Sequence, residues 1–205
     1  MLQALESLDE RVFLFLNGIH NPFWDEIMYW ISNRFIWIPL YLFILMWMYK
    51  ILKNRLWILL LFLILLVAMS DQISVHLFKN VFQRLRPCHN EEIKSVVHLV
   101  RNHCGGLYGF VSSHASNAFA VALFTLFIIR NRWFSAGILL WAFATAYSRI
   151  YLGVHYPGDV LAGSLLGVLI GWLVWWLWKL SDGWLGKHWK WYRKAYIIDD
   201  KDATD

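Results

Sequence analysis

The stretch SRIYLGVHYPGD, residues 148–159, places an arginine, a histidine and an aspartate between two long apolar runs. His155 and Asp159 are four residues apart, which brings an imidazole beside a carboxylate if a helix starts near Pro157, and proline suits a first helical turn. A carboxylate bonded to one ring nitrogen of a histidine leaves the other nitrogen as a nucleophile or base. Arg149 adds a planar cation that matches phosphate oxygens. The stretch indicates chemistry on an anion, although a structural histidine–aspartate pair is the alternative.

Two further clusters place cations, hydroxyls and a second histidine beside apolar runs. Their polar residues are Lys79 and Arg86 in KNVFQRLRP, and Ser112, Ser113 and His114 in VSSHASN. The serines precede an expected helix, and the N–H groups and positive dipole end of a helix start favour an anion. Taken singly, the cations also fit lipid headgroup contacts, the serines a helix cap, and the histidine a buried hydrogen-bonded side chain. As a set at the ends of membrane helices, these ionisable residues predict a phosphate-binding site.

Five apolar stretches are expected to position these clusters. They lie at 35–50, 56–78, 114–130, 133–150 and 158–178. Crossing a bilayer takes about 20 residues in a helix, and a segment in lipid must satisfy its own backbone hydrogen bonds. The chain is 59% hydrophobic, and such uninterrupted stretches leave no face for water, which argues against a soluble helical protein.

The predicted fold is therefore all-α, a polytopic membrane helix bundle with about five transmembrane helices in a single domain, residues 1–205. Its expected parts are an interfacial helix at 1–22, a helix bundle at 35–178 and a cytoplasmic tail at 179–205. Apolar residues recur at helical spacing near the N-terminus, at Leu5, Leu8, Val12 and Phe15. This pattern predicts a helix that lies in the membrane interface.

Basic residues between the spans predict the orientation in the membrane. The segments on one side carry Lys50, Lys53, Arg55, Arg130, Arg132, Lys179, Lys187, Lys190, Arg193, Lys194 and Lys201. The positive-inside rule makes that side cytoplasmic and places the three polar clusters on the periplasmic side of a bacterial inner membrane. The outer loops also carry cations, which a phosphate site would explain. Because the cations fall in short groups between spans, topology accounts for them better than a nucleic-acid partner; the oligomeric state stays open.

The three clusters resemble the signature of the type 2 phosphatidic acid phosphatase (PAP2) superfamily, which includes bacterial acid phosphatases and vanadium haloperoxidases. That signature reads K-x6-R-P, then P-S-G-H, then S-R-x5-H-x3-D. The first and third motifs match in full, whereas Val111 replaces proline and Ser113 replaces glycine in the second. Serine keeps its backbone N–H, so phosphate binding is expected to survive. The flanking apolar spans fit the membrane branch of the family.

The resemblance implies a role for each matched residue. His155 would attack phosphorus to form a phosphohistidine, Asp159 would orient it, and His114 would protonate the leaving oxygen and then activate water. The phosphoryl oxygens would be held by Lys79, Arg86, Ser112, Ser113 and Arg149. No metal or other cofactor is implied, because these cations stabilise the charge of the transition state.

The resemblance further implies an integral membrane lipid phosphatase acting on a lipid phosphate or diphosphate. The SSHA sequence and the loop bracketed by cysteines are similar to undecaprenyl-diphosphate phosphatases, so undecaprenyl diphosphate is the first predicted substrate. Phosphatidylglycerophosphate, phosphatidate and a lipid A phosphate are alternatives that the sequence does not separate. A lipid-phosphate transporter is the non-enzymatic alternative, but it would not need a histidine–aspartate pair opposite a second histidine.

Two cysteines, Cys88 and Cys104, bracket the loop that follows the first motif. In an oxidising periplasm they predict a disulfide. The alternative is a zinc site built from these cysteines with His89, His98 and His103. The residue types suit zinc, but their spacing matches no common zinc module, and the disulfide is the favoured prediction.

Overall fold

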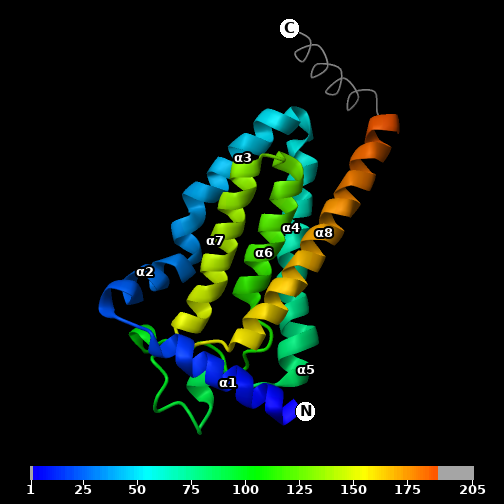
Figure 1. The fold of residues 1–205 in the computed structure, drawn as a ribbon. Coiled ribbons are helices and arrows are strands. Elements are labelled where there is room, and N and C mark those ends of the chain that lie inside the picture. The colour runs from blue at the N-terminus through cyan, green and yellow to red at the C-terminus, as the bar shows by residue number, and fades with distance from the viewer. Residues whose placement is uncertain (1, 189–205) are drawn as a thin grey trace.

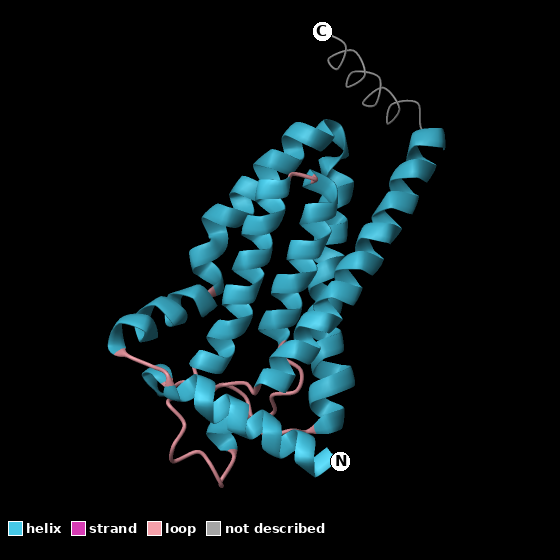
Figure 2. Cartoon of the chain, in the orientation of Figure 1, coloured by secondary structure: helices cyan, strands magenta, loops and turns pink. Residues whose placement is uncertain are grey.

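Helices make up the regular structure of residues 2–188, the part of the chain that the computed structural model describes (Figures 1 and 2). The elements are α1 Leu2–Gly18, α2 Pro22–Ser32, η1 Arg34–Trp37, α3 Ile38–Leu52, η2 Lys53–Arg55, α4 Leu56–Gln72, η3 Ile73–Lys79, α5 Asn80–Phe82, η4 Pro87–His89, η5 Val100–Asn102, α6 Ser113–Ile129, α7 Arg132–Tyr151 and α8 Pro157–His188. The η3 segment is a π-helix. These residues contain no strand beyond an isolated bridge between Leu85 and Tyr108. The all-α prediction is confirmed.

The long helices α3, α4, α6, α7 and α8 form the bundle (Figure 1) and lie where the apolar spans were predicted. Three helical stretches are long and apolar enough to cross a bilayer, at Arg34–Leu52, Leu56–Phe82 and Pro157–His188. α6 is apolar but has 17 residues, and most of its side chains are buried by neighbouring helices. Large apolar side chains on the outer helices, such as Leu61, Leu140 and Leu169, stay exposed. Such a surface suits lipid, whose tails are as apolar as leucine.

The N-terminal helix α1 lies across the end of the bundle at which α6 and α8 begin (Figure 1). Its predicted apolar stripe is exposed, as expected for a helix in the membrane interface, at Leu5, Leu8, Val12 and Phe15. On the opposite face, Phe13 packs edge-on against Tyr156, with 5.3 Å between ring centroids. The side chain of Asn17 bonds both backbone groups of His98 and donates to the carbonyl oxygen of Tyr151 at 2.8 Å. α1 therefore ties the loop before α6 to the end of α7.

Glycine at every fourth residue of GSLLGVLIG predicts a close helix contact, within the bundle or between two copies of the chain. The structure supports packing within the bundle, because Gly163, Gly167 and Gly171 face α6. A side-chain carbon at Gly163 would lie 2.5 Å from the carbonyl oxygen of Ser112, and one at Gly171 would lie 2.8 Å from that of Ala120. The close approach also lets the backbone N–H of Ser112 donate to the carbonyl oxygen of Asp159, in the first turn of α8, at 3.0 Å.

The last helix continues beyond the end of the predicted fifth span, to His188. Arg55 and Asp182 form a buried ion pair with 3.4 Å between nitrogen and oxygen. Because a buried charge needs a partner, this pair anchors the end of α8 to the turn between α3 and α4. The described part of the predicted tail, 179–188, is helical and continues α8. The rest of the predicted tail, 189–205, lies outside the described residues.

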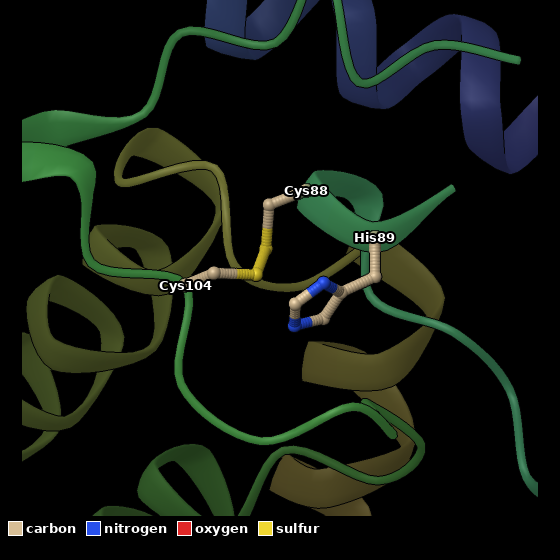
Figure 3. Close-up of side chains that lie close together, drawn as sticks. All are labelled: Cys88, His89 and Cys104. Carbon is tan, nitrogen blue, oxygen red and sulfur yellow. A yellow bond between two sulfur atoms is a disulfide. The ribbon is translucent and has the colours of Figure 1, made fainter. Parts of the chain in front are cut away.

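The long loop between α5 and α6 contains a disulfide that joins Cys88 to Cys104, with 6.0 Å between their Cα atoms (Figure 3). His89 lies beside the bridge (Figure 3). The other two histidines of the zinc alternative lie elsewhere: His98 pairs with an aspartate of α2, and His103 lines a cavity beside α7. The five residues of that alternative are therefore not gathered into one site.

We expect the Cys88–Cys104 linkage in protein isolated from membranes, because the loop is predicted to face an oxidising compartment. Peptide mapping without reductant should recover the two loop fragments as one linked peptide, and reduction should separate them. Two free thiols together with stoichiometric zinc would contradict the disulfide and favour the metal alternative.

Candidate active site

The three polar clusters meet at the end of the bundle that α1 covers. Lys79 ends η3, Arg86 follows α5, Ser112 precedes α6, Ser113 and His114 begin it, Arg149 lies in the last turn of α7, His155 lies between α7 and α8, and Asp159 lies in the first turn of α8. Contacts between the side chains and shared cavity walls connect them. The structure therefore brings together the eight residues that the sequence analysis proposed for catalysis and phosphate binding.

His155 and Asp159 form a buried pair, 1% and 0% exposed. Nδ1 of His155 lies 3.4 Å from Oδ2 of Asp159, so the two groups are in contact at a distance longer than a well-formed hydrogen bond. The backbone N–H of His155 donates to the carbonyl oxygen of Arg149 at 3.2 Å and closes the turn between α7 and α8. Gly153 allows this turn because its φ is +77° and a side-chain carbon there would lie 2.5 Å from a loop carbonyl. The pair is therefore held in place by the backbone around it.

Two of the cations contact other site residues directly. Nη1 of Arg86 lies 3.2 Å from Nε2 of His155, the ring nitrogen that faces away from the aspartate. Nζ of Lys79 donates to Oγ of Ser113 at 2.9 Å. A positive charge thus lies directly beside the outward ring nitrogen of His155, and a second lies at the start of α6.

The third cation, Arg149, donates through Nη1 to Oγ of Ser32 at the end of α2. The sequence had not predicted Ser32 as a neighbour of the site. The Nε atoms of Arg86 and Arg149 are buried, and each lacks a hydrogen-bond partner within the described residues. Charged donors placed in this way are suited to the oxygens of a phosphate.

The start of α6 keeps its form despite the two departures in the second motif. Ser112 is the N-cap, and its Oγ accepts from the N–H of Ala115 at 3.5 Å. Val111, which stands where the family has proline, is fully buried. Ser113, which stands where it has glycine, still begins the helix and bonds a cation. A helix start of this form leaves backbone N–H groups without partners within the helix, which favours an anion.

His114 lies between two cavities and is exposed to them. The larger, of about 780 Å³, runs from Ser113 and His114 into the bundle. The smaller, of about 200 Å³, is lined by His114, Arg149 and His103. A histidine in this position can exchange a proton with a group in either cavity.

Electrostatics favour a neutral, nucleophilic His155. Burial, reinforced by the charges of Arg86, Arg149 and Lys79, holds the pKa of His155 well below that of an ordinary imidazole. Burial also lowers the pKa of Arg86, and Asp159 partly opposes this, but a guanidinium stays protonated at neutral pH. The arrangement combines a neutral ring nitrogen with fixed positive charge.

The structure adds two residues that the sequence analysis missed, Arg84 and Asp9. Arg84 donates through Nη1 to Oδ1 of Asp159 at 2.8 Å and through Nη2 to Oδ2 of Asp9 at 2.7 Å. Its guanidinium lies over the ring of Tyr156, 4.1 Å from the centroid. Asp9 also accepts from the N–H of Gly158 at 2.7 Å. Arg84 lies within the six-residue spacer of the first motif, between Lys79 and Arg86. Its positive charge was the only feature of the sequence that could have indicated a role in the site.

Two groups of side chains within residues 2–188 have metal-ligating atoms within 4.8 Å of one another. They are Cys88, His89 and Cys104, and His20, Asp25 and His98. The first group is closed by the disulfide, and in the second Nε2 of His98 lies 3.0 Å from Oδ1 of Asp25. Neither group contains a residue of the predicted phosphate site.

A buried histidine–aspartate pair with cations and a helix start near it, at the end of a membrane bundle, is suited to chemistry on phosphoryl groups. The chain belongs to the PAP2 superfamily, whose sequence profile matches residues 56–182. It is a membrane lipid phosphatase of that family. The predicted family and enzyme class are confirmed.

Known proteins resemble the chain along most of its length. A lipid A 4'-phosphatase of Bacteroides thetaiotaomicron is 41% identical over 172 residues, which are 82% of this chain and 75% of that protein. An undecaprenyl-diphosphatase of Bacillus subtilis is 26% identical over 165 residues, 80% of each protein. The crystal structure of a transmembrane PAP2 type phosphatidylglycerolphosphate phosphatase from Bacillus subtilis shares the fold, with a TM-score of 0.67 and 24% identity, over 91% of this chain and 89% of that one.

Proposed function

We propose that the protein removes a phosphate from a lipid A-type phosphoglycolipid through a phosphohistidine intermediate. The observation that carries the chemistry is the buried His155–Asp159 pair, whose outward nitrogen lies 3.2 Å from Arg86. The preference for lipid A over undecaprenyl diphosphate, the first prediction from the sequence, rests on 41% identity to a lipid A 4'-phosphatase against 26% to an undecaprenyl-diphosphatase. Undecaprenyl diphosphate becomes the second candidate, supported by that lower similarity.

In the proposed reaction, Nε2 of His155 bonds to phosphorus as the bond from phosphorus to the lipid oxygen breaks. His114 gives that oxygen its proton, so the lipid leaves as an alcohol. His114 then takes a proton from water, whose oxygen attacks phosphorus and releases inorganic phosphate and free His155. Arg86 and Arg149, with Lys79, stabilise the charge on the phosphoryl oxygens in both steps.

The proposal is tested by phosphate release from purified protein, in buffer containing EDTA, with lipid A, undecaprenyl diphosphate, phosphatidate and phosphatidylglycerophosphate as substrates. We expect lipid A to give the highest kcat/KM and His155→Ala to give no turnover. Activity that EDTA abolishes and magnesium restores would contradict the predicted independence from metals. A higher kcat/KM for undecaprenyl diphosphate would reverse the order of the two candidates, and no release from any substrate would overturn the function.

We expect the active site to face the periplasm, because the cationic turns lie at the opposite end of the bundle. In a variant without Cys88 and Cys104, a single cysteine at Lys94 should react with an impermeant thiol reagent in intact spheroplasts, and one at Lys50 should not. Both side chains are exposed in the structure, so membrane sidedness decides the result. Labelling of Lys50→Cys without Lys94→Cys would show the inverted orientation.

Replacing Arg84 by glutamine should lower kcat by about 10-fold to 100-fold while KM changes little, because a lost hydrogen bond to a charged group is worth about 1.5–3 kcal/mol. The reason is that Arg84 holds the carboxylate of Asp159 at 2.8 Å without being among the predicted phosphate-binding residues. Arg84→Lys should recover part of the rate. Steady-state kinetics of variants with matched thermal stability measure the effect.

The matched control for Arg84 is Arg101→Gln, which breaks an exposed ion pair with Glu26. Exposed pairs contribute about 0–1 kcal/mol, so this variant should keep wild-type kinetics. A change confined to KM in Arg84→Gln, or an equal loss in both variants, would contradict a role in positioning Asp159.

A further inference from the structure

The larger cavity begins at the proposed general acid and continues into the bundle. Its volume is about 780 Å³, and it passes from Ser113 and His114 between α3, α4, α6 and α7, with apolar side chains such as Leu63, Val67 and Val121 in its wall. Cavities that bind small molecules have volumes of about 300–1,000 Å³. His114 is proposed to protonate the leaving oxygen, and of the two cavities that it lines this one has the volume to hold part of the lipid, since the other is about 200 Å³.

Three residues that line this cavity each have a buried polar atom without a hydrogen-bond partner. The atoms are Oδ1 of Asn117, Nε1 of Trp141 and Oγ1 of Thr145, and no described residue bonds them. Buried polar groups are usually bonded, and leaving one unpaired lowers stability. Three such residues around one cavity indicate a ligand that supplies the missing partners.

Thr125, which lines the same cavity, forms hydrogen bonds within its own helix. Its hydroxyl donates to carbonyl oxygens one turn earlier in its own helix, at 2.8 Å to Val121 and 3.1 Å to Ala122. The Thr145 hydroxyl has no such bond, although its backbone carbonyl accepts from Ser148. The unpaired state is therefore a property of particular positions and does not follow from the residue type.

The three residues lie at a distance from the catalytic end that matches the part of a lipid phosphate between its phosphate group and its hydrocarbon chains. Asn117 follows His114 by three residues on α6, while Thr145 and Trp141 precede Arg149 by four and eight residues on α7. At 1.5 Å per residue, these positions lie about 5–12 Å along the helices from the catalytic end. In an acylated sugar phosphate or glycerol phosphate, hydroxyl, amide and ester groups occupy this distance range, whereas a polyprenyl phosphate has only carbon there.

We propose that Asn117, Trp141 and Thr145 form a subsite that binds the polar linkage region of the leaving group and selects acylated sugar or glycerol phosphates over polyprenyl phosphates. The inference rests on the proposed lipid phosphatase function. The tryptophan N–H and the threonine hydroxyl donate to carbonyls, and the asparagine oxygen accepts from a hydroxyl or amide. A site built to bond such groups rejects an analogue without them, because its own polar atoms then stay unpaired.

The test compares kcat/KM for a diacylated glucose phosphate with that for farnesyl phosphate in the variants Asn117→Leu, Trp141→Phe and Thr145→Val. The wild type should prefer the acylated sugar, and each variant should lower that preference about tenfold, the effect of one lost hydrogen bond. With a dialkyl ether counterpart of the sugar phosphate, which has no carbonyls, Trp141→Phe and Thr145→Val should leave kcat/KM unchanged. Thr125→Val, whose hydroxyl is already bonded, should leave the preference unchanged. Unchanged preferences in all three test variants would overturn the proposal.

A binding measurement separates failure of this inference from failure of the proposed function. The diacylated glucose without its phosphate should raise the thermal unfolding temperature of the wild type, and the dialkyl ether should raise it less. Thr145→Val should remove that difference while keeping or raising the unfolding temperature without ligand, because it deletes an unpaired buried group. If both lipids raise the unfolding temperature of the wild type equally, the subsite is overturned, whether or not the protein releases phosphate. If Thr145→Val unfolds at a lower temperature than the wild type without ligand, Thr145 has a structural role and the subsite assignment of this residue is overturned.

Discussion

His155→Ala is expected to abolish both turnover and phosphoenzyme, with a loss on the order of 10⁶-fold, as when an activated nucleophile is removed from an enzyme. The reason is that His155 offers a buried, neutral ring whose Nδ1 faces Asp159 and whose Nε2 faces Arg86. No other ring nitrogen among the predicted site residues is backed by a carboxylate in this way. Rapid-quench labelling with a radiolabelled activated phosphate measures the intermediate directly.

The label should be lost in acid and retained in base, which is the behaviour of a phosphorus–nitrogen bond. His89→Ala is the matched control, because His89 lies beside the disulfide (Figure 3) and outside the phosphate site. It should label like the wild type. Label on His155→Ala, or attachment to a different residue in the wild type, would overturn the assignment of the nucleophile.

His114→Ala should have a different and substrate-dependent effect. With a natural lipid phosphate, whose leaving group is poor, the rate should fall by about 10²–10⁴-fold, the usual contribution of a general acid or base. With p-nitrophenyl phosphate the leaving group needs little protonation, so phosphohistidine should still form. It should then accumulate, because no base activates the attacking water. The position of His114 between the two cavities is the structural basis of this expectation.

Wild-type turnover of p-nitrophenyl phosphate is the control that the small substrate enters the site. His114→Gln, which keeps a side chain of similar size, should behave like the alanine variant if proton transfer is what has been lost. His155→Ala is expected to give no label with the activated substrate. If His114→Ala also gives none, then His114 acts in the first step by a means other than protonation of the leaving group.

The helices were predictable because membrane helices depend mostly on local composition. Each apolar span must satisfy its backbone hydrogen bonds internally, so length and hydropathy were enough to predict α3, α4, α6, α7 and α8. The first and third motifs were equally local, since His155 and Asp159 need only one turn and a helix start to meet. The separate helix α2 was missed, because its sequence is short and its place depends on contacts such as Ser32 with Arg149.

The sequence by itself determined the membrane bundle, the three polar clusters and the chemistry that their residue types allow. Only the tertiary structure decided which side chains support that chemistry. Arg84 reaches Asp159 and Asp9 across 75 positions of sequence in each direction, and the unpaired atoms of Asn117 and Thr145 come from different helices that face one cavity. Hydrogen bonds and cavity walls of this kind depend on how helices pack and not on local propensity, so no pattern within one segment could have predicted them.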